Sequence, residues 1–193
     1  MKKNKFCGLQ FSFSKQSIRL YYLDLNKPIP EIKTQIKTDI SFHERPIELE
    51  NLKPSIVEDR IANGHKIFVA YHLSKPIAYL FAADKDCWVS EIEDRLILGA
   101  GEVYLYDAYT YSKFRGKHIY PFLIYNAAKY FKKLSYSKAL ISSTTANTAS
   151  IRGIEKAGFS YSQTIDFLNI FGWKFWNYVK GTNNVESRFS NEI

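Results

Sequence analysis

A strand, a basic glycine turn, a helix and a second strand follow one another in the middle of the chain, and this order constrains the fold most. Residues 102–110, EVYLYDAYT, alternate as a β-strand does and run directly into the turn KFRGK. From Ile119 the apolar residues recur at spacings of three and four, which predicts a helix with one buried stripe. Residues 138–145, KALISSTT, predict the next strand. The sequence therefore predicts an α/β domain in which the glycine turn joins a strand to a helix.

A second, shorter helix is expected at NTASIRGIEKAGF, residues 147–159. Asn147 is a good N-cap residue, Ile151 and Ile154 share the inward face, and Gly158 suits the end of the helix. Two β-rich runs before this core, residues 66–73 and 76–83, are spaced as a hairpin. Two more strands are expected after it, around a tight turn at residues 171–173.

The remaining segments are less regular. Residues 17–25 predict a strand, and Pro54 opens a short helix that ends near Gly64. Residues 31–50 look polar and irregular. We expect residues 181–193 to form a flexible tail.

Length, charge and composition limit the kinds of ligand and partner that we expect for this chain. A chain of 193 residues is the size of one domain, and its formal net charge of +8 favours anionic ligands. The basic residues are scattered, so a ligand with several phosphates ranks above nucleic acid. Cys7, Cys87 and the four histidines show no metal-ligand spacing, and no run is apolar enough to span a membrane. We expect a cytoplasmic protein with no metal, no nucleic-acid partner and no membrane, as a monomer or a homodimer.

The turn at Gly116 has the chemistry of a phosphate site. Amides at a helix N-terminus lack intrahelical acceptors, and the helix dipole adds partial positive charge. Arg115 and Lys117 add full charges, and glycine allows close approach of the backbone. Taken alone, the same residues could be an ordinary basic loop.

Two segments together resemble the GCN5-related N-acetyltransferase (GNAT) superfamily. Residues 109–124, YTYSKFRGKHIYPFLI, resemble its acetyl-CoA motif, a strand followed by R-G-x-G-x-G/A and a helix. Residues 147–159 resemble the motif that follows it. The resemblance implies a mixed, mostly antiparallel twisted α/β sheet with helices on both faces and a central V-shaped splay. It also implies one acetyltransferase domain over residues 1–193, with a variable part at 1–50 and a coenzyme-binding core at 102–160.

The resemblance implies N-acetyl transfer from acetyl-CoA to an amine, with the coenzyme in the gap where strand 102–110 parts from strand 138–145. The residues expected to bind the coenzyme are Ala108, Thr110, Arg115, Gly116, Lys117, His118, Ile119, Tyr120 and Asn147. A backbone N–H on the first strand would polarise the thioester carbonyl, and the amine would attack directly.

The sequence offers more than one candidate for the general base and for the general acid. Glu102 and Asp107 are the carboxylates by position, but they fall on opposite faces of a regular strand, so at most one faces the cleft unless a bulge intervenes. The tyrosine that often protonates the leaving thiolate in this family corresponds here to Ile154. Tyr111, Tyr109 or Tyr161 could replace it.

The sequence also leaves several alternatives for the amine that accepts the acetyl group. A small-molecule amine, such as an amino sugar, is our first hypothesis, and a protein or peptide amine is the second. His118 and Tyr120 stand where the family has small residues, so a non-catalytic acyl-CoA-binding domain is a further alternative.

Overall fold

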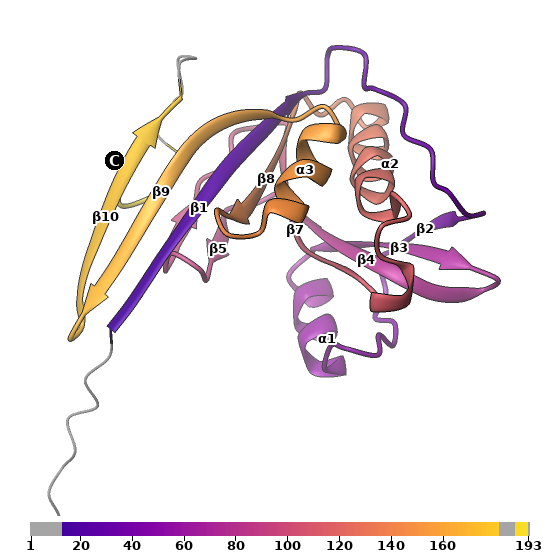
Figure 1. The fold of residues 1–193 in the computed structure, drawn as a ribbon, viewed down its shortest axis with the longest axis horizontal. Helices are drawn as coiled ribbons and strands as arrows, with labels where there is room; N and C mark the ends of the chain where they lie inside the picture. Colours follow the sequence, from indigo (N-terminus) through magenta and orange to yellow (C-terminus); the bar gives the residue numbers. More distant parts are fainter. Residues whose placement is uncertain (1–12, 182–187, 193) are drawn as a thin grey trace, which may run out of the picture.

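The computed structural model describes residues 13–181 and 188–192, and its main feature is one eight-stranded sheet (Figure 1). The strand order is β10-β9-β1-β8-β7-β4-β3-β2, and a separate two-stranded ribbon holds β5 and β6. The elements are β1 Phe13–Asp24, β2 Asp39–His43, α1 Pro54–Ala62, β3 Lys66–His72, β4 Lys75–Ala83, β5 Cys87–Val89, β6 Asp94–Leu96, β7 Glu102–Thr110, the 3-10 turn Ser112–Phe114, α2 Ile119–Lys133, β8 Lys138–Thr144, α3 Thr148–Lys156, β9 Ser160–Ile170 and β10 Trp173–Lys180.

The sheet opens at its centre. β7 and β8 are its one parallel pair among the described strands, and they pair only from Glu102 opposite Lys138 to Leu105 opposite Ile141. Beyond that point β7 continues beside β4 and β8 continues beside β1, so the two halves of the sheet diverge (Figure 1). The mixed, mostly antiparallel sheet with a V-shaped splay is confirmed.

Helices cover both faces of the sheet, as expected. On one face α2 and α3 pack over the largest hydrophobic cluster, which includes Leu105, Ile124 and Ile154. On the other face α1 packs through Val57 onto β3 and β4. The β5–β6 ribbon covers the rest of that second face.

The local sequence explains most of these elements. The hairpin of β3 and β4, the helix that starts at Pro54 and the capped helix α3 all lie where their patterns predict them. The stripe of α2 is buried, but Leu134 is 50% exposed because the helix ends at Lys133.

Two expectations about the irregular segments are wrong. Residues 39–43 form strand β2 at the sheet edge beside β3, within the part expected to be irregular. The expected flexible tail covers residues 182–187 and 193, which lie outside the described residues, but residues 188–192 are firmly packed. Phe189 is 0% exposed, and hydrogen bonds from Ile97 N to Arg188 O and from Ser190 N to Arg95 O attach this segment to β6.

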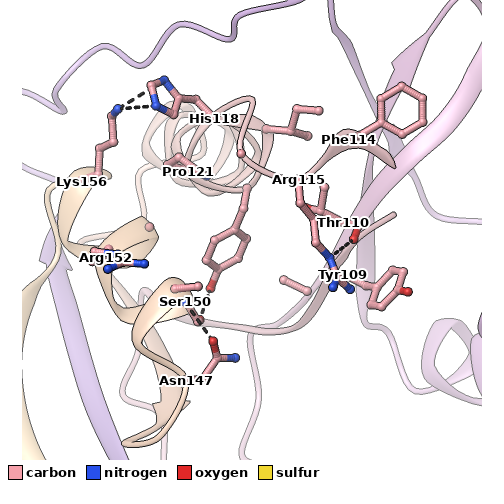
Figure 2. Close-up of a pocket in the computed structure, with 16 residues that line it drawn as sticks. Tyr109, Thr110, Phe114, Arg115, His118, Pro121, Asn147, Ser150, Arg152 and Lys156 are labelled. Atoms are coloured by element: carbon pink, nitrogen blue, oxygen red, sulfur yellow. Dashed lines mark hydrogen bonds between the residues drawn. The ribbon is translucent and has the colours of Figure 1, made fainter. Parts of the chain in front are cut away.

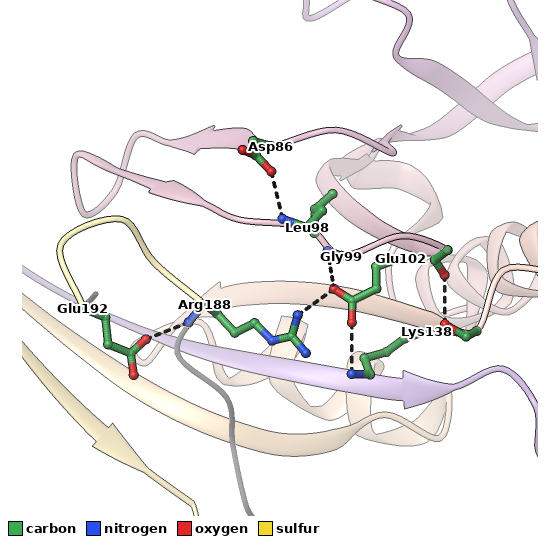
Figure 3. Close-up of polar contacts among 9 residues, drawn as sticks. Asp86, Leu98, Gly99, Glu102, Lys138, Arg188 and Glu192 are labelled. Atoms are coloured by element: carbon green, nitrogen blue, oxygen red, sulfur yellow. Dashed lines mark hydrogen bonds and ion pairs between the residues drawn. The ribbon is translucent and has the colours of Figure 1, made fainter.

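Side chains of residues 188–192 also make polar contacts with the rest of the domain (Figure 3). The Arg188 guanidinium lies 2.6 Å from the Glu102 carboxylate, at the start of β7. Ser190 donates a hydrogen bond to Asp94, which is 0% exposed. A pattern analysis misses this segment because its contacts are made with residues far away in sequence.

Candidate functional site

A cavity of about 650 Å³ lies between the end of β7, the N-terminus of α2 and one face of α3 (Figure 2). Of the residues expected to bind the coenzyme, all but Lys117 line it. The full lining is Ala108, Tyr109, Thr110, Phe114, Arg115, Gly116, His118, Ile119, Tyr120, Pro121, Asn147, Ala149, Ser150, Arg152, Gly153 and Lys156. The structure therefore gathers both sequence motifs around one space.

The turn before α2 exposes a run of backbone amides to this cavity. Within residues 13–181 and 188–192, the amides of residues 116–120 have no backbone acceptor, and Pro121 has no amide hydrogen. Gly116 has φ +78°, and a Cβ placed there would meet no atom within 4 Å. His118 has φ +61°, a left-handed conformation that histidine tolerates better than most side chains. The turn thus leaves these amides free although His118 stands where the family pattern has its second small residue.

The end of β7 offers a strand edge to the same cavity. A register shift lies between Tyr79 and Phe81 of β4, which face Tyr109 and Tyr106 of β7, and Asp107 has φ +43°. Two residues of β7 thus stand opposite one of β4, which defines a β-bulge. Since β8 has already diverged, the β7 edge beyond Leu105 faces the splay instead of a strand. Ala108 and Thr110 line the cavity on that edge.

Basic side chains surround the cavity. Arg115 donates from Nε to the Thr110 carbonyl at 3.0 Å and lies over the Tyr109 ring. On the opposite side, Arg152 and Lys156 project from α3 (Figure 2). Lys117 is not part of the lining, and its Nζ lies 5.6 Å from the centre of the Phe114 ring. Arg152 is not among the residues predicted from the sequence, and Lys156 is predicted as a solvated surface charge. The available signal was their spacing of four residues, which places both on one face of α3 with Ala149.

Asn147 caps α3, as its residue type predicts. Its side-chain oxygen accepts from the Ser150 amide at 3.0 Å, which fixes the first turn of the helix at the cavity wall.

Tyr120 occupies space that a small residue would leave open. A Cβ on Gly153 would lie 2.5 Å from Tyr120 Cδ1, so the ring lies directly against the α3 backbone. The Tyr120 hydroxyl is 3.0 Å from Ser150 Oγ. Burial raises the pKa of Tyr120 to about 12, so the hydroxyl stays protonated at neutral pH. Tyr120 therefore bridges α2 to α3 and narrows the cavity between them.

Because of this contact, we expect Gly153→Ala to destabilise the fold, although a glycine-to-alanine change within a helix is usually stabilising. At an open helix position the change would stabilise the fold by about 1 kcal/mol. Here the added methyl collides with the ring, and we expect a loss of about 1–3 kcal/mol in the free energy of unfolding, measured by urea denaturation. In a Tyr120→Ala background the same change should become stabilising. A destabilising effect of equal size in both backgrounds would contradict the packing described.

Asp107 faces away from the cavity, toward α1. Its carboxylate pairs with the Arg60 guanidinium, which also lies over the Phe81 and Tyr106 rings. Tyr106, the preceding residue, faces the same way and hydrogen-bonds the His65 ring. The bulge thus turns two consecutive side chains to one face. Asp107 remains next to the splay, on the face opposite α2 and α3.

Glu102 does not belong to this site, and its selection as a candidate base is wrong. It begins β7, about 20 Å of strand away from Ala108. Its carboxylate binds Lys138, Arg188 and the Gly99 amide at 2.6–3.0 Å (Figure 3). Burial would raise the pKa of Glu102, but the hydrogen bond from Gly99 and the two cations outweigh it and lower that pKa. The carboxylate is a structural anchor for the segment at residues 188–192.

Glu102→Gln should therefore reduce stability without weakening ligand binding in the cavity. We expect a loss of roughly 2 kcal/mol at pH 7, less than for a fully buried pair because the Lys138 side chain is 32% exposed. Because the pKa of Glu102 is lowered in the folded state, its carboxylate contributes stability at neutral pH, and this contribution is lost as the pH falls from about 5 through the folded pKa. The free energy of unfolding of the variant should therefore fall less steeply at acid pH than that of the wild type. Urea denaturation at several pH values measures both effects. Glu93→Gln, in the exposed pair with Lys174, is the control, and an equal loss there would contradict this role.

Tyr111 also lies outside the cavity. Its hydroxyl accepts from the Glu50 amide at 3.2 Å. Tyr161 lies on β9 beside Thr164 and Val179. Of the tyrosines considered as general acids from the sequence, Tyr109 alone lines the cavity. Ile154, at the usual tyrosine position, is 0% exposed and packs in the core.

Comparison with solved structures identifies the architecture. No protein-family model and no curated protein matches the sequence. A GNAT-family acetyltransferase from Colwellia psychrerythraea superposes with a TM-score of 0.54 over 82% of this chain and 57% of that one, at 15% identity. A GCN5-related N-acetyltransferase from Sphaerobacter thermophilus gives 0.52 over 88% and 54%, at 12% identity. The chain has the GNAT fold.

A Drosophila protein solved by structural genomics superposes similarly, with a TM-score of 0.55 over 83% of this chain and 52% of that one, at 8% identity. Identities this low establish the GNAT fold alone. The chain spans little more than half the length of these three proteins. In the part of the chain that the structure describes, no helix is long and apolar enough to span a membrane.

Proposed function

We propose that this chain is an N-acetyltransferase that moves an acetyl group from acetyl-CoA to a primary amine of a small molecule, such as an amino sugar. One observation carries the proposal. A single cavity joins the free amides at the start of α2 to the unpaired edge of β7 at the splay. A ligand with a polyanionic end and an amide-containing arm fits both features.

The residues of the turn would hold the polyanionic end. The amides of residues 116–120 and the α2 dipole favour a pyrophosphate group, and Arg115 adds charge at the rim. The arm would run along β7, where Ala108 offers backbone groups. The Thr110 carbonyl already accepts from Arg115, so we assign Ala108 the larger part of that pairing. Asn147, with its side-chain amide at the α3 wall, faces the same path.

Acetyl-CoA supplies an activated acyl group when bound, and an amine can attack it without an enzyme nucleophile. The bulge at Asp107 and Ala108 gives a backbone N–H beside the splay that suits polarisation of a carbonyl. An amine must lose a proton to attack, and Asp107 is the carboxylate beside the splay. Its pairing with Arg60 orients the carboxylate on the face away from α2 and α3. We therefore propose that the acceptor enters from the α1 face.

A second candidate function rests on a separate observation. Ile154 is buried where the family has a tyrosine, and Tyr120 narrows the cavity. Both favour a domain that binds acyl-CoA without turnover. A protein or peptide amine remains the alternative acceptor.

Release of free thiol from acetyl-CoA tests the proposal directly. We expect thiol release with at least one amine in a panel of amino sugars, polyamines and amino acids, and loss of that release in Asp107→Asn with coenzyme binding retained. Peptide substrates form a second panel, which separates the acceptor classes. Binding of acetyl-CoA without thiol release in either panel would favour the non-catalytic domain, and full turnover in Asp107→Asn would reject Asp107 as the base.

A further inference from the structure

The cavity carries a second group of cations that the turn before α2 does not include. Arg152 and Lys156 are four residues apart on α3, so they lie on one helix face, and both are exposed at the cavity rim. Across the rim, the Lys156 Nζ lies 3.1 Å from His118 Nε2 (Figure 2). The basic pair, Arg152 and Lys156, is thus positioned toward the cavity instead of away from it.

The basic pair is not neutralised by the protein. Among the described residues, neither side chain makes an ion pair with a carboxylate, and the same holds for Arg115. The acidic residue of α3, Glu155, follows Arg152 by three positions but accepts from the Tyr21 hydroxyl at 3.5 Å. Exposed cations at one rim attract an anion more strongly when no internal carboxylate competes for them.

The basic pair projects from α3, whereas the free amides belong to the turn before α2, and Lys156 reaches across the rim to the His118 ring of that turn. Arg115 stands on the other side of the α2 N-terminus from Arg152 and Lys156 (Figure 2). Tyr120 bridges α2 to Gly153 and Ser150 of α3 in the same cavity. The cavity therefore suits a ligand with two distinct anionic groups, one at the amides and one at the basic pair.

Coenzyme A has two such groups, a pyrophosphate and a 3′-phosphate on its ribose. We propose that Arg152 and Lys156 bind the 3′-phosphate, so that the protein selects coenzyme A over dephospho-coenzyme A. This inference rests on the proposed function, because it assumes that the cavity holds the coenzyme.

Calorimetric titration of the wild-type chain with coenzyme A and with dephospho-coenzyme A tests this selectivity. We expect coenzyme A to bind about tenfold or more tightly, the effect of a doubly charged phosphate on two cations. In the double variant Arg152→Gln/Lys156→Gln the affinity for coenzyme A should fall to that for dephospho-coenzyme A, which itself should change little.

The matched control is Lys129→Gln/Lys133→Gln, which removes the same charge from exposed positions of α2 outside the cavity. Equal affinity of the wild type for both ligands would overturn the inference and leave the proposed function standing. Equal weakening of both ligands in the Arg152/Lys156 variant would also overturn it, because that is a general charge effect. Failure of both ligands to bind the wild type would overturn the proposed function itself.

Discussion

Phe189→Ala is expected to lower the free energy of unfolding by about 3–5 kcal/mol, the usual cost of emptying a buried phenylalanine site. Phe189 is 0% exposed and packs with Leu96, Phe167 and Tyr178 on the second face of the sheet. Its backbone bridges to Leu96, so the residue extends the β5–β6 ribbon. The segment at residues 188–192 then anchors Glu102 through Arg188.

Urea denaturation of the wild type and the variant measures this loss. Phe13→Ala serves as the control, because Phe13 is 69% exposed on β1 and its removal should cost less than about 1 kcal/mol. If Phe189→Ala costs no more than Phe13→Ala, residues 188–192 are not part of the folded core.

Gly116→Glu should weaken acetyl-CoA binding by about 100-fold or more. The new carboxylate would stand among the free amides of the turn and repel the phosphates that we propose to bind there. The position has open space, since no atom lies within 4 Å of a Cβ, so the backbone can keep its path at the cost of left-handed strain. The loss should therefore appear in affinity more than in folding.

Gly64→Glu is a closely matched control for this variant. Gly64 has φ +84° and equally open space, but it lies after α1, outside the cavity. The control has the same change of residue type, charge and backbone strain. Calorimetric titration should give wild-type affinity for Gly64→Glu, and equal affinities in the two variants would place the phosphates elsewhere.

The parts of the site that could be predicted from the sequence are those whose structure depends on residues close together in the chain. Strand β7, helix α2 and the cap at Asn147 were each predicted from a few neighbouring residues, and each was confirmed. These elements carry most of the cavity lining, so its approximate position could be inferred before the fold was known.

The rest depends on contacts between distant residues. The bulge at Asp107 arises where β7 leaves β8 and stays with β4, and no local pattern marks it. Tyr120 could be seen as a departure from the family pattern, but its packing on Gly153 requires the approach of α2 to α3. Glu102 was misjudged because Arg188, its partner, lies 86 residues later in the chain.

The most direct test of the central claim is a calorimetric titration of acetyl-CoA into the wild-type chain at two salt concentrations. The cavity at the start of α2 predicts saturable binding of one acetyl-CoA per chain, with an affinity that falls as salt screens the phosphates. The absence of binding at low salt would contradict the assignment of this cavity to the coenzyme.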